Sequence, residues 1–358
     1  MASPRRILLL VAAILIQAHR TDQALPLVIN TWAFTNATLR AHQWLVVGEA
    51  GPIDALVEGC SVCEREQCDG TVGYGGSPDE NGETTLDAMI MDGSTMNIGA
   101  VAAMRDVKHA AAVARHVLEN TKHTLLVGDR ATEFAVQMGF KRESLETERS
   151  KEMWEQWKNN HCQPNFWQNV IPSPSMSCGP YEPISGNAIP QNHWTSNELN
   201  EDDHAPTFNR FNHDTIGMIV IDAEGSRGGR EPRPTELATR SRVAWEILPI
   251  PGSGAYADST VGAAAATGDG DIMMRFMPSL LAVEGLRRGL SPMQAGETAL
   301  ARIAVHYPNF VGGIVVASSD GQYGAACHGM DEFPYSVAEG SKVTEVVVKK
   351  VKCRTKRR

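Results

Sequence analysis

Hydrophobic positions along the chain follow two periods, and each period predicts a different kind of element. Alternating or continuous runs rich in β-branched residues predict strands, at residues 27–32, 85–92, 124–127, 216–221, 311–317 and 323–327. Apolar residues that recur every three or four positions predict helices, at residues 55–68, 104–118, 131–138, 143–160, 272–290 and 292–306. Each half of the chain runs from strands to helices and back to strands. This order predicts an α+β fold of antiparallel sheets with helices outside them.

Two segments interrupt the periodicity. Residues from about 179 to 212 are polar, rich in Pro, Asn and Gly, and predict a linker. Residues 68–78 form a glycine-dense loop. No Gly-Lys-Ser/Thr sequence closes that loop, so it does not predict nucleotide binding.

The polar stretch ends at Asp214–Thr215, directly before a predicted strand. Asp-Thr in this position is ordinarily a turn that leads into a strand. Cleavage of the Asp214–Thr215 bond, however, would give Thr215 a hydroxyl and a free α-amino group, which is a nucleophile with its own base. Cleavage there would divide a single domain into two chains, residues 25–214 and 215–358.

Residues 262–271 are an alanine-rich run interrupted by glycines. Their small side chains allow close packing and expose backbone N–H groups around Thr267 and Gly268, as an oxyanion-binding site requires. A tight strand-to-helix connection would have the same composition, and both interpretations can hold together.

Composition limits the function classes. The chain has 358 residues, 42% of them hydrophobic, and a formal net charge of -9 with interspersed charges. This is enough for one large core or two modest ones, and it does not indicate a nucleic-acid partner. The basic run at residues 349–358 is interpreted as a solvated tail.

The N-terminus predicts a signal peptide within residues 1–24. Two arginines precede the apolar run Ile7–Ile16, and small residues follow it. That run is too short to span a bilayer, and no later segment is long and apolar enough, so we expect a soluble mature protein without a membrane partner.

Seven cysteines fit an oxidising compartment. Their positions predict three disulfides and leave Cys60 over as a buried, small apolar residue; the pairs are Cys63 with Cys68, Cys162 with Cys178, and Cys327 with Cys353. Cys60 and Cys63 have zinc-knuckle spacing, but no second pair follows at the required distance, so no metal site is expected. Asn36 begins a glycosylation acceptor sequence, in agreement with secretion.

Long motifs in the chain resemble the glycosylasparaginase (aspartylglucosaminidase) family of the N-terminal nucleophile hydrolase superfamily. In chain order they are residues 30–34, 63–70, 75–80, 84–93, 213–218, 254–258 and 263–271. The resemblance covers nearly the whole mature chain. It implies a four-layer αββα fold, a precursor that cuts itself before Thr215, and a dimer of the resulting αβ units.

The resemblance also implies a reaction, namely hydrolysis of the amide that joins N-acetylglucosamine to free asparagine, in the lysosome or after secretion and without a cofactor. Thr215 would be the nucleophile. The other roles fall into four groups: oxyanion donors Thr267 and Gly268, substrate-loop residues Asp269 and Gly270, pocket residues Trp32 and Phe34, and self-cleavage residues Asp214 and Thr71. For Trp32 and Phe34, ordinary core packing is the alternative.

Between Ala223 and Pro249 the resemblance fails. The family has an Arg and an Asp there that hold the substrate α-carboxylate and α-amine, but Ala244 and Ile247 occupy those positions. Neither can form an ion pair. Arg242 is the nearest arginine, but it lies two residues before the position of the family Arg, which Ala244 occupies.

One hypothesis explains this departure. Allowed codons for Trp245–Pro249, read one nucleotide earlier and after a G, can encode the expected Val-Gly-Asp-Ser-Pro. Allowed codons for Pro232–Glu236, read in the same way, can encode Thr-Ser-Thr-Asn-Gly. Because the same shifted frame restores the family motif at two separate places, a reading-frame error in the printed sequence is favoured over real divergence from the family. If residues 224–249 are correct as printed, we expect a gap where a central strand belongs and the loss of the substrate clamp.

Two other functions remain open from the sequence. An isoaspartyl peptidase or plain asparaginase would share the fold and nucleophile, although the signal segment, the cysteine pairs and the loop at residues 68–78 argue against it. A non-catalytic secreted protein, uncleaved or without the clamp, is the alternative from a different class.

Overall fold

The computed structural model describes residues 25–47, 51–68, 70, 72–184, 215–222, 235–241, 250–342 and 345–354, with backbone alone for residues 235–241. The predicted signal peptide, Asp69, Thr71 and Asp214 lie outside the described residues, as do most of residues 224–249.

The described residues form strands and helices in both parts of the chain. The strands are β1 (Leu27–Thr31), β2 (Leu86–Asp92), β3 (Ile98–Met104), β4 (Leu125–Val127), β5 (Val170–Ile171), β6 (Glu182–Pro183), β7 (Thr215–Ile221), β8 (Thr235–Ser241), β9 (Ala255–Asp258), β10 (Gly262–Gly268), β11 (Gly312–Ser318), β12 (Tyr323–His328), β13 (Glu332–Glu339) and β14 (Val347–Lys352). The helices are α2 (Thr35–Val47), α3 (Pro52–Glu66), α4 (Ala110–Asn120), α5 (Asp129–Gln137), α6 (Glu148–Asn159), α7 (Gly270–Phe276), α8 (Pro278–Arg287) and α9 (Pro292–His306).

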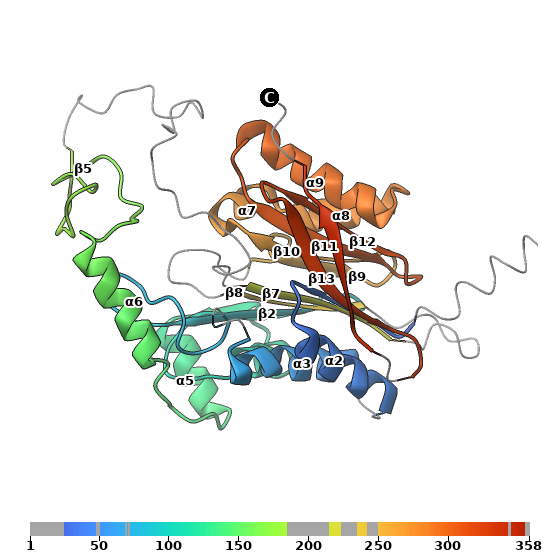
Figure 1. Cartoon of the computed structure of the whole chain (residues 1–358). Coiled ribbons are helices and arrows are strands. Elements are labelled where there is room, and N and C mark those ends of the chain that lie inside the picture. The colour runs from blue at the N-terminus through green and yellow to red at the C-terminus, as the bar shows by residue number, and fades with distance from the viewer. Residues whose placement is uncertain are drawn as a thin grey trace, which may run out of the picture.

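Two sheets lie face to face at the centre of the molecule (Figure 1). The larger has eight strands in the order β14-β13-β1-β7-β8-β2-β3-β4, and the smaller has four in the order β12-β11-β10-β9. All neighbours are antiparallel except β3 and β4. The mixture of helices with mainly antiparallel sheets that the sequence predicts is confirmed.

Helices cover the outer faces of the two sheets. Helices α2, α3 and α4 pack on the eight-stranded sheet, and α8 and α9 pack on the four-stranded sheet (Figure 1). One apolar core joins the two sheets to the first group of helices, and a second lies between the smaller sheet and the C-terminal helices. No helix of the described part of the chain is long and apolar enough to cross a membrane.

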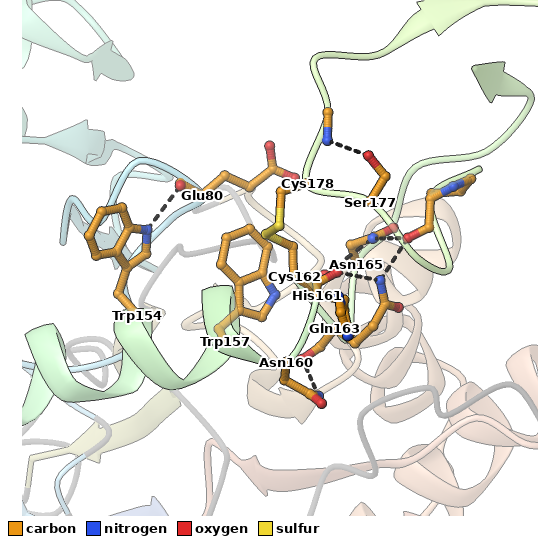
Figure 2. The surroundings of a disulfide bond; sticks show 12 residues. Glu80, Trp154, Trp157, Asn160, His161, Cys162, Gln163, Asn165, Ser177 and Cys178 are labelled. Atoms are coloured by element: carbon orange, nitrogen blue, oxygen red, sulfur yellow. Dashed lines mark hydrogen bonds between the residues drawn. A yellow bond between two sulfur atoms is a disulfide. The ribbon is translucent and has the colours of Figure 1, made fainter. Parts of the chain in front are cut away.

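The segment that follows α6, residues 160–184, is closed by a disulfide and lies away from the two larger sheets (Figure 1). The Cys162–Cys178 bond closes it, and the indole N–H of Trp154 on α6 donates to the Glu80 carbonyl at 3.0 Å (Figure 2). The Asn165 and Gln163 amides both donate to the Pro174 carbonyl, at 2.6 Å. This segment is therefore held by one disulfide, by hydrogen bonds that include the pairing of β5 with β6, and by the Trp167–Tyr181 ring contact.

All three predicted disulfides are confirmed. Cys63 pairs with Cys68, Cys162 with Cys178, and Cys327 with Cys353. Cys60 lies outside these pairs and is buried in α3, as predicted.

Three predictions about elements are wrong. Residues 272–290 form two helices rather than one, because Met277 adopts φ +52° and Pro278 begins α8. Residues 255–258 form β9, although the sequence predicts no strand there and the Pro-Gly-Ser-Gly near the start of residues 250–258 favours a loop. The central gap expected around residues 224–249 is absent, because the backbone of Thr235–Ser241 forms β8 between β7 and β2. That segment contains no proline, so every backbone N–H can join the sheet.

Asp87 is a buried carboxyl in the middle of the larger sheet. It is fully buried, its Oδ1 accepts the Ala103 N–H at 2.6 Å, and its Oδ2 has no partner among the described residues. Ala103 adopts φ +48° beside a register shift between β2 and β3. Burial raises the pKa of Asp87 well above its ordinary value, and the Ala103 hydrogen bond opposes this only in part.

We expect Asp87→Asn to flatten the pH dependence of stability. Because the folded pKa is raised, the folded state keeps this proton longer than the unfolded state does. The contribution is complete below the ordinary pKa and is lost as pH rises towards the folded value. Asn keeps an acceptor for Ala103 but does not titrate. Chemical denaturation at about pH 5 and pH 7.5 should show a smaller loss of stability in the variant, by up to roughly 1.4 kcal/mol per pH unit.

The exposed Asp106, which pairs with Arg142, provides the matched control. Asp106→Asn makes the same substitution on the surface and should be measured in parallel, to show the effect of the substitution itself. Parallel slopes for wild type and Asp87→Asn would show that Asp87 is ionised in the folded chain.

Candidate active site

Thr215 is the first residue of β7, a strand whose seven residues are all buried. Thr215 itself is 5% exposed. The strand lies between β1 and β8, and Thr215 pairs with Ser241. The candidate nucleophile is therefore held by a central strand rather than by a loop, and a central strand positions a reacting group firmly.

β7 approaches β10 of the facing sheet at Gly217. A Cβ at Gly217 would lie 3.0 Å from the Ala265 Cβ, which is closer than ordinary side-chain contact. The Gly217 N–H donates to Thr31 Oγ1 at 2.9 Å, and Thr31 is fully buried. Thr31 thus fixes the backbone two residues beyond Thr215. Thr31 lies in the motif at residues 30–34, but the sequence assigned it no role, since its signal was only its place in that motif next to Trp32.

Trp32, the residue after β1, links the end of that strand to the end of β10. Its indole N–H donates to Thr267 Oγ1 at 3.0 Å, and the residue is 4% exposed. Its backbone has φ +65°, a conformation uncommon for a large side chain. The consecutive residues Thr31 and Trp32 therefore join β1 to both β7 and β10.

Thr267 and Gly268 end β10 and are both buried. Gly268 has φ +130°, and a Cβ there would lie 2.4 Å from the Val311 carbonyl oxygen. No other residue fits this position without displacing the backbone. The tight connection predicted from the glycines is confirmed, and β10 brings Thr267 to Trp32.

Asp269 and Gly270 lie at the start of α7. The Asp269 carboxylate accepts the Ile272 N–H at 3.1 Å and caps the helix. Burial, opposed by this hydrogen bond, raises the Asp269 pKa. Gly270 is the first residue of the helix and is buried. Capping is a structural role, and the substrate contacts predicted for both residues stay predictions.

Phe34 is buried in the core just before α2, where its carbonyl accepts the Thr38 N–H at 3.2 Å. Its predicted pocket role is untested. Asn36 is exposed in the first turn of α2, and its side-chain amide donates to Glu66 at 3.1 Å. The predicted glycosylation site is therefore accessible. Asp214 and Thr71, predicted for self-cleavage, lie outside the described residues, as do Arg242, Ala244 and Ile247.

The described part of the chain contains no group of three or more His, Cys, Asp or Glu side chains arranged for a metal ion. The described side chains that link β1 to β7 and β10 at this end of the sheets are the hydroxyls of Thr31 and Thr267 and the indole of Trp32. Such groups can donate hydrogen bonds to a developing negative charge, and a threonine with a free amine can supply nucleophile and base.

A family model described as asparaginase matches residues 6–348, and the chain belongs to this family of hydrolases with the N-terminal nucleophile fold. The N(4)-(beta-N-acetylglucosaminyl)-L-asparaginase of Mus musculus is 48% identical over 350 residues, or 97% of each chain. Its namesake from Rattus norvegicus is 50% identical over 315 residues, which are 88% of this chain and 87% of the rat protein. A Drosophila persimilis protein provisionally named for the same activity is 54% identical over 332 residues, 89% of this chain and 81% of its own.

We expect Thr31→Val to destabilise the chain, because valine keeps the volume but leaves the buried Gly217 N–H without its acceptor. An unsatisfied buried donor costs about 1–3 kcal/mol. Thermal unfolding should show a lower midpoint, whereas Thr31→Ser, which keeps the hydroxyl, should lose less. A valine variant at least as stable as the serine variant would contradict the importance of this hydrogen bond.

Proposed function

We propose that the chain is an N4-(β-N-acetylglucosaminyl)-L-asparaginase that cuts itself between Asp214 and Thr215 and then hydrolyses the amide between N-acetylglucosamine and asparagine. The proposal rests on the consecutive residues Thr31 and Trp32 at the end of β1. Thr31 accepts a hydrogen bond from the strand that starts at Thr215, and Trp32 donates one to Thr267. The names of the mouse and rat relatives support the substrate.

The first step is self-cleavage. The Thr215 hydroxyl attacks the Asp214 carbonyl, and the peptide shifts from the Thr215 nitrogen to its oxygen as an ester. Water then hydrolyses this ester, which frees the Asp214 carboxylate, the Thr215 hydroxyl and the Thr215 α-amine. Asp214 and Thr71 are the residues assigned to this step. The resulting chains are residues 25–214 and 215–358.

The second step is acyl transfer. The free α-amine of Thr215 takes the hydroxyl proton as Oγ attacks the side-chain carbonyl of the substrate asparagine. The amine then protonates the leaving nitrogen, and glycosylamine departs from an aspartyl ester. Water, activated by the same amine, hydrolyses the ester to aspartate and restores Thr215.

Thr267 and Gly268 are assigned to the oxyanion of both tetrahedral intermediates. Thr267 Oγ1 accepts the Trp32 indole N–H, so its own proton remains available for donation. Trp32 and Phe34 are assigned to the pocket wall, and Asp269 and Gly270 to the loop that meets the substrate.

The proposal also covers the layered fold, the quaternary structure and the cellular location of the enzyme. The two facing sheets with outer helices support a four-layer αββα sandwich, and two αβ units form the dimer. A signal peptide at residues 1–24 would direct the chain through the secretory pathway to the lysosome. The three disulfides support this oxidising route.

The substrate clamp depends on how residues 224–249 are translated. Sequencing the transcript decides between the printed residues and the frame that restores Val-Gly-Asp-Ser-Pro at Trp245–Pro249. The frame-restored enzyme would hold the α-carboxylate and α-amine of asparagine, and the printed one would lack that clamp.

Thr215→Ala tests nucleophile and self-cleavage together. We expect a single uncut chain in the intact-mass spectrum and a loss of glycoasparagine hydrolysis by a factor of about 10³ or more. Thr215→Ser keeps a hydroxyl and should yield both chains and a measurable rate. Two chains from the alanine variant would disprove the assigned cleavage.

Substrate preference separates this function from its nearest alternative. With wild-type protein we expect release of aspartate from N-acetylglucosaminyl-asparagine to exceed release from a β-aspartyl dipeptide. The reverse order would favour an isoaspartyl peptidase. Two chains without activity on either substrate would favour the clamp-less binding protein.

A further inference from the structure

Phe333 lies beside the candidate site but belongs to no motif singled out from the sequence. It is on β13 and fully buried. Its ring meets the Trp32 ring edge to face, with centroids 5.2 Å apart and an angle of 85° between the planes. This is a favoured arrangement for two aromatic rings, and it fixes the orientation of both.

Gly313 makes room for the Phe333 ring on its other side. A Cβ at Gly313 would lie 3.0 Å from three carbon atoms of that ring, so any larger residue would push the ring away. Gly313 is the β11 residue that pairs with Thr267 on β10. The Phe333 ring is therefore packed between Trp32 and the strand pair that carries Thr267.

The Trp32 indole needs such support. Its backbone is held at φ +65°, so the local chain does not favour the observed orientation by itself. Two described contacts fix the ring, namely the N–H bond to Thr267 Oγ1 at 3.0 Å and the Phe333 ring edge. The Tyr335 ring in turn packs against the Phe333 ring, with centroids 6.5 Å apart.

We propose that Phe333 is a positioning residue, which holds the Trp32 indole so that its N–H binds Thr267 Oγ1 and leaves the Thr267 proton free for the oxyanion. This role rests on the proposed function. It acts through Trp32, and Phe333 itself need not touch substrate.

Phe333→Leu in the full, self-cleaved protein tests the proposal. Leucine fills much of the space but has no ring edge, so the indole is less firmly oriented. We expect kcat to fall about tenfold with KM within about twofold, because orientation of an oxyanion donor matters most in the transition state. Unchanged kcat would overturn the proposal.

Phe310→Leu is the matched control. Phe310 is as deeply buried, at 2% exposed, but belongs to the second core between the smaller sheet and the C-terminal helices. Its truncation should lower thermal stability to a comparable extent and leave kcat within about twofold of wild type. An equal fall of kcat in both variants would mean that general loosening of the core is responsible, and the proposal would be wrong.

A double-mutant cycle shows whether Phe333 acts through Trp32. Trp32→Phe removes the N–H but keeps a ring. If Phe333 works only by orienting that N–H, the double variant should have the kcat of Trp32→Phe alone. Multiplicative losses would place the effect of Phe333 elsewhere and overturn the assignment.

A spectroscopic measurement works even if the proposed function fails. In protein labelled with ¹⁵N-tryptophan, Trp32→Phe identifies the Trp32 indole N–H signal. Phe333→Leu should move this signal upfield and speed its exchange with solvent, whereas Phe333→Tyr, which restores a ring edge, should return both towards wild type. An unmoved signal would overturn the positioning role. Wild-type protein inactive on glycoasparagine but with a shifted signal would refute the function alone. If Phe333→Leu does not fold, Phe333→Met, closer in volume, replaces it.

Discussion

The close approach of β7 to β10 at Gly217 is the contact on which the rest of the candidate site depends. A methyl group at Gly217 would lie 3.0 Å from the Ala265 Cβ, so two small residues set the spacing of the two sheets there. The alanine run of β10 serves the same purpose, since each small side chain lets the strands come closer. Thr215 comes two residues earlier on β7 and inherits its position from this packing. A nucleophile placed by sheet-to-sheet contact moves only if the core moves, which favours a reaction that needs a fixed attack geometry.

The sequence predicts six strands of the two larger sheets, every described helix except α2, and the three disulfides, because these depend on local periodicity and spacing; it does not predict α2, β3, β13 or β14. It fails where a residue's partner lies far along the chain. Thr31 and Phe333 acquire their roles from Gly217 and Trp32. Thr31 lies in the motif at residues 30–34 but nothing local assigns it a role, and no local pattern marks Phe333. The alanine run has no periodicity that predicts a strand, yet it forms β10, because its place between the larger sheet and α8 requires small side chains. The division of residues 272–290 did have a local signal, since proline favours the first turn of a helix.

Two buried titratable groups make the fold respond to acid in opposite directions. The raised pKa of Asp87 makes acid conditions stabilising through that carboxyl. His42 is fully buried on α2, with Nε2 at 2.9 Å from the Gly340 carbonyl, and burial lowers its pKa. The folded state then binds this proton less well than the unfolded state, so the contribution of His42 to stability falls as pH drops through its ordinary value. Asp87 lies in the sheet that carries the nucleophile, and His42 lies in the outer helical layer. Acid therefore favours the folded state through Asp87 and disfavours it through His42, where burial outweighs the hydrogen bond to the Gly340 carbonyl.

The left-handed backbone conformation at Trp32 explains how the consecutive residues Thr31 and Trp32 can contact two different strands, β7 and β10. Alternation along β1 sends Thr31 towards the face that meets the smaller sheet, where its hydroxyl accepts the N–H of Gly217 on the neighbouring strand β7. The same alternation would send the next side chain towards the helices. Asn30 follows this rule, since it pairs with Ser336, whose hydroxyl contacts Thr38 on α2. At φ +65° the chain turns, and the Trp32 side chain also enters the space between the sheets, where it reaches Thr267. A strained residue of this kind persists only where its surroundings hold it. The site therefore requires aromatic packing around Trp32 in addition to the groups that would touch the substrate.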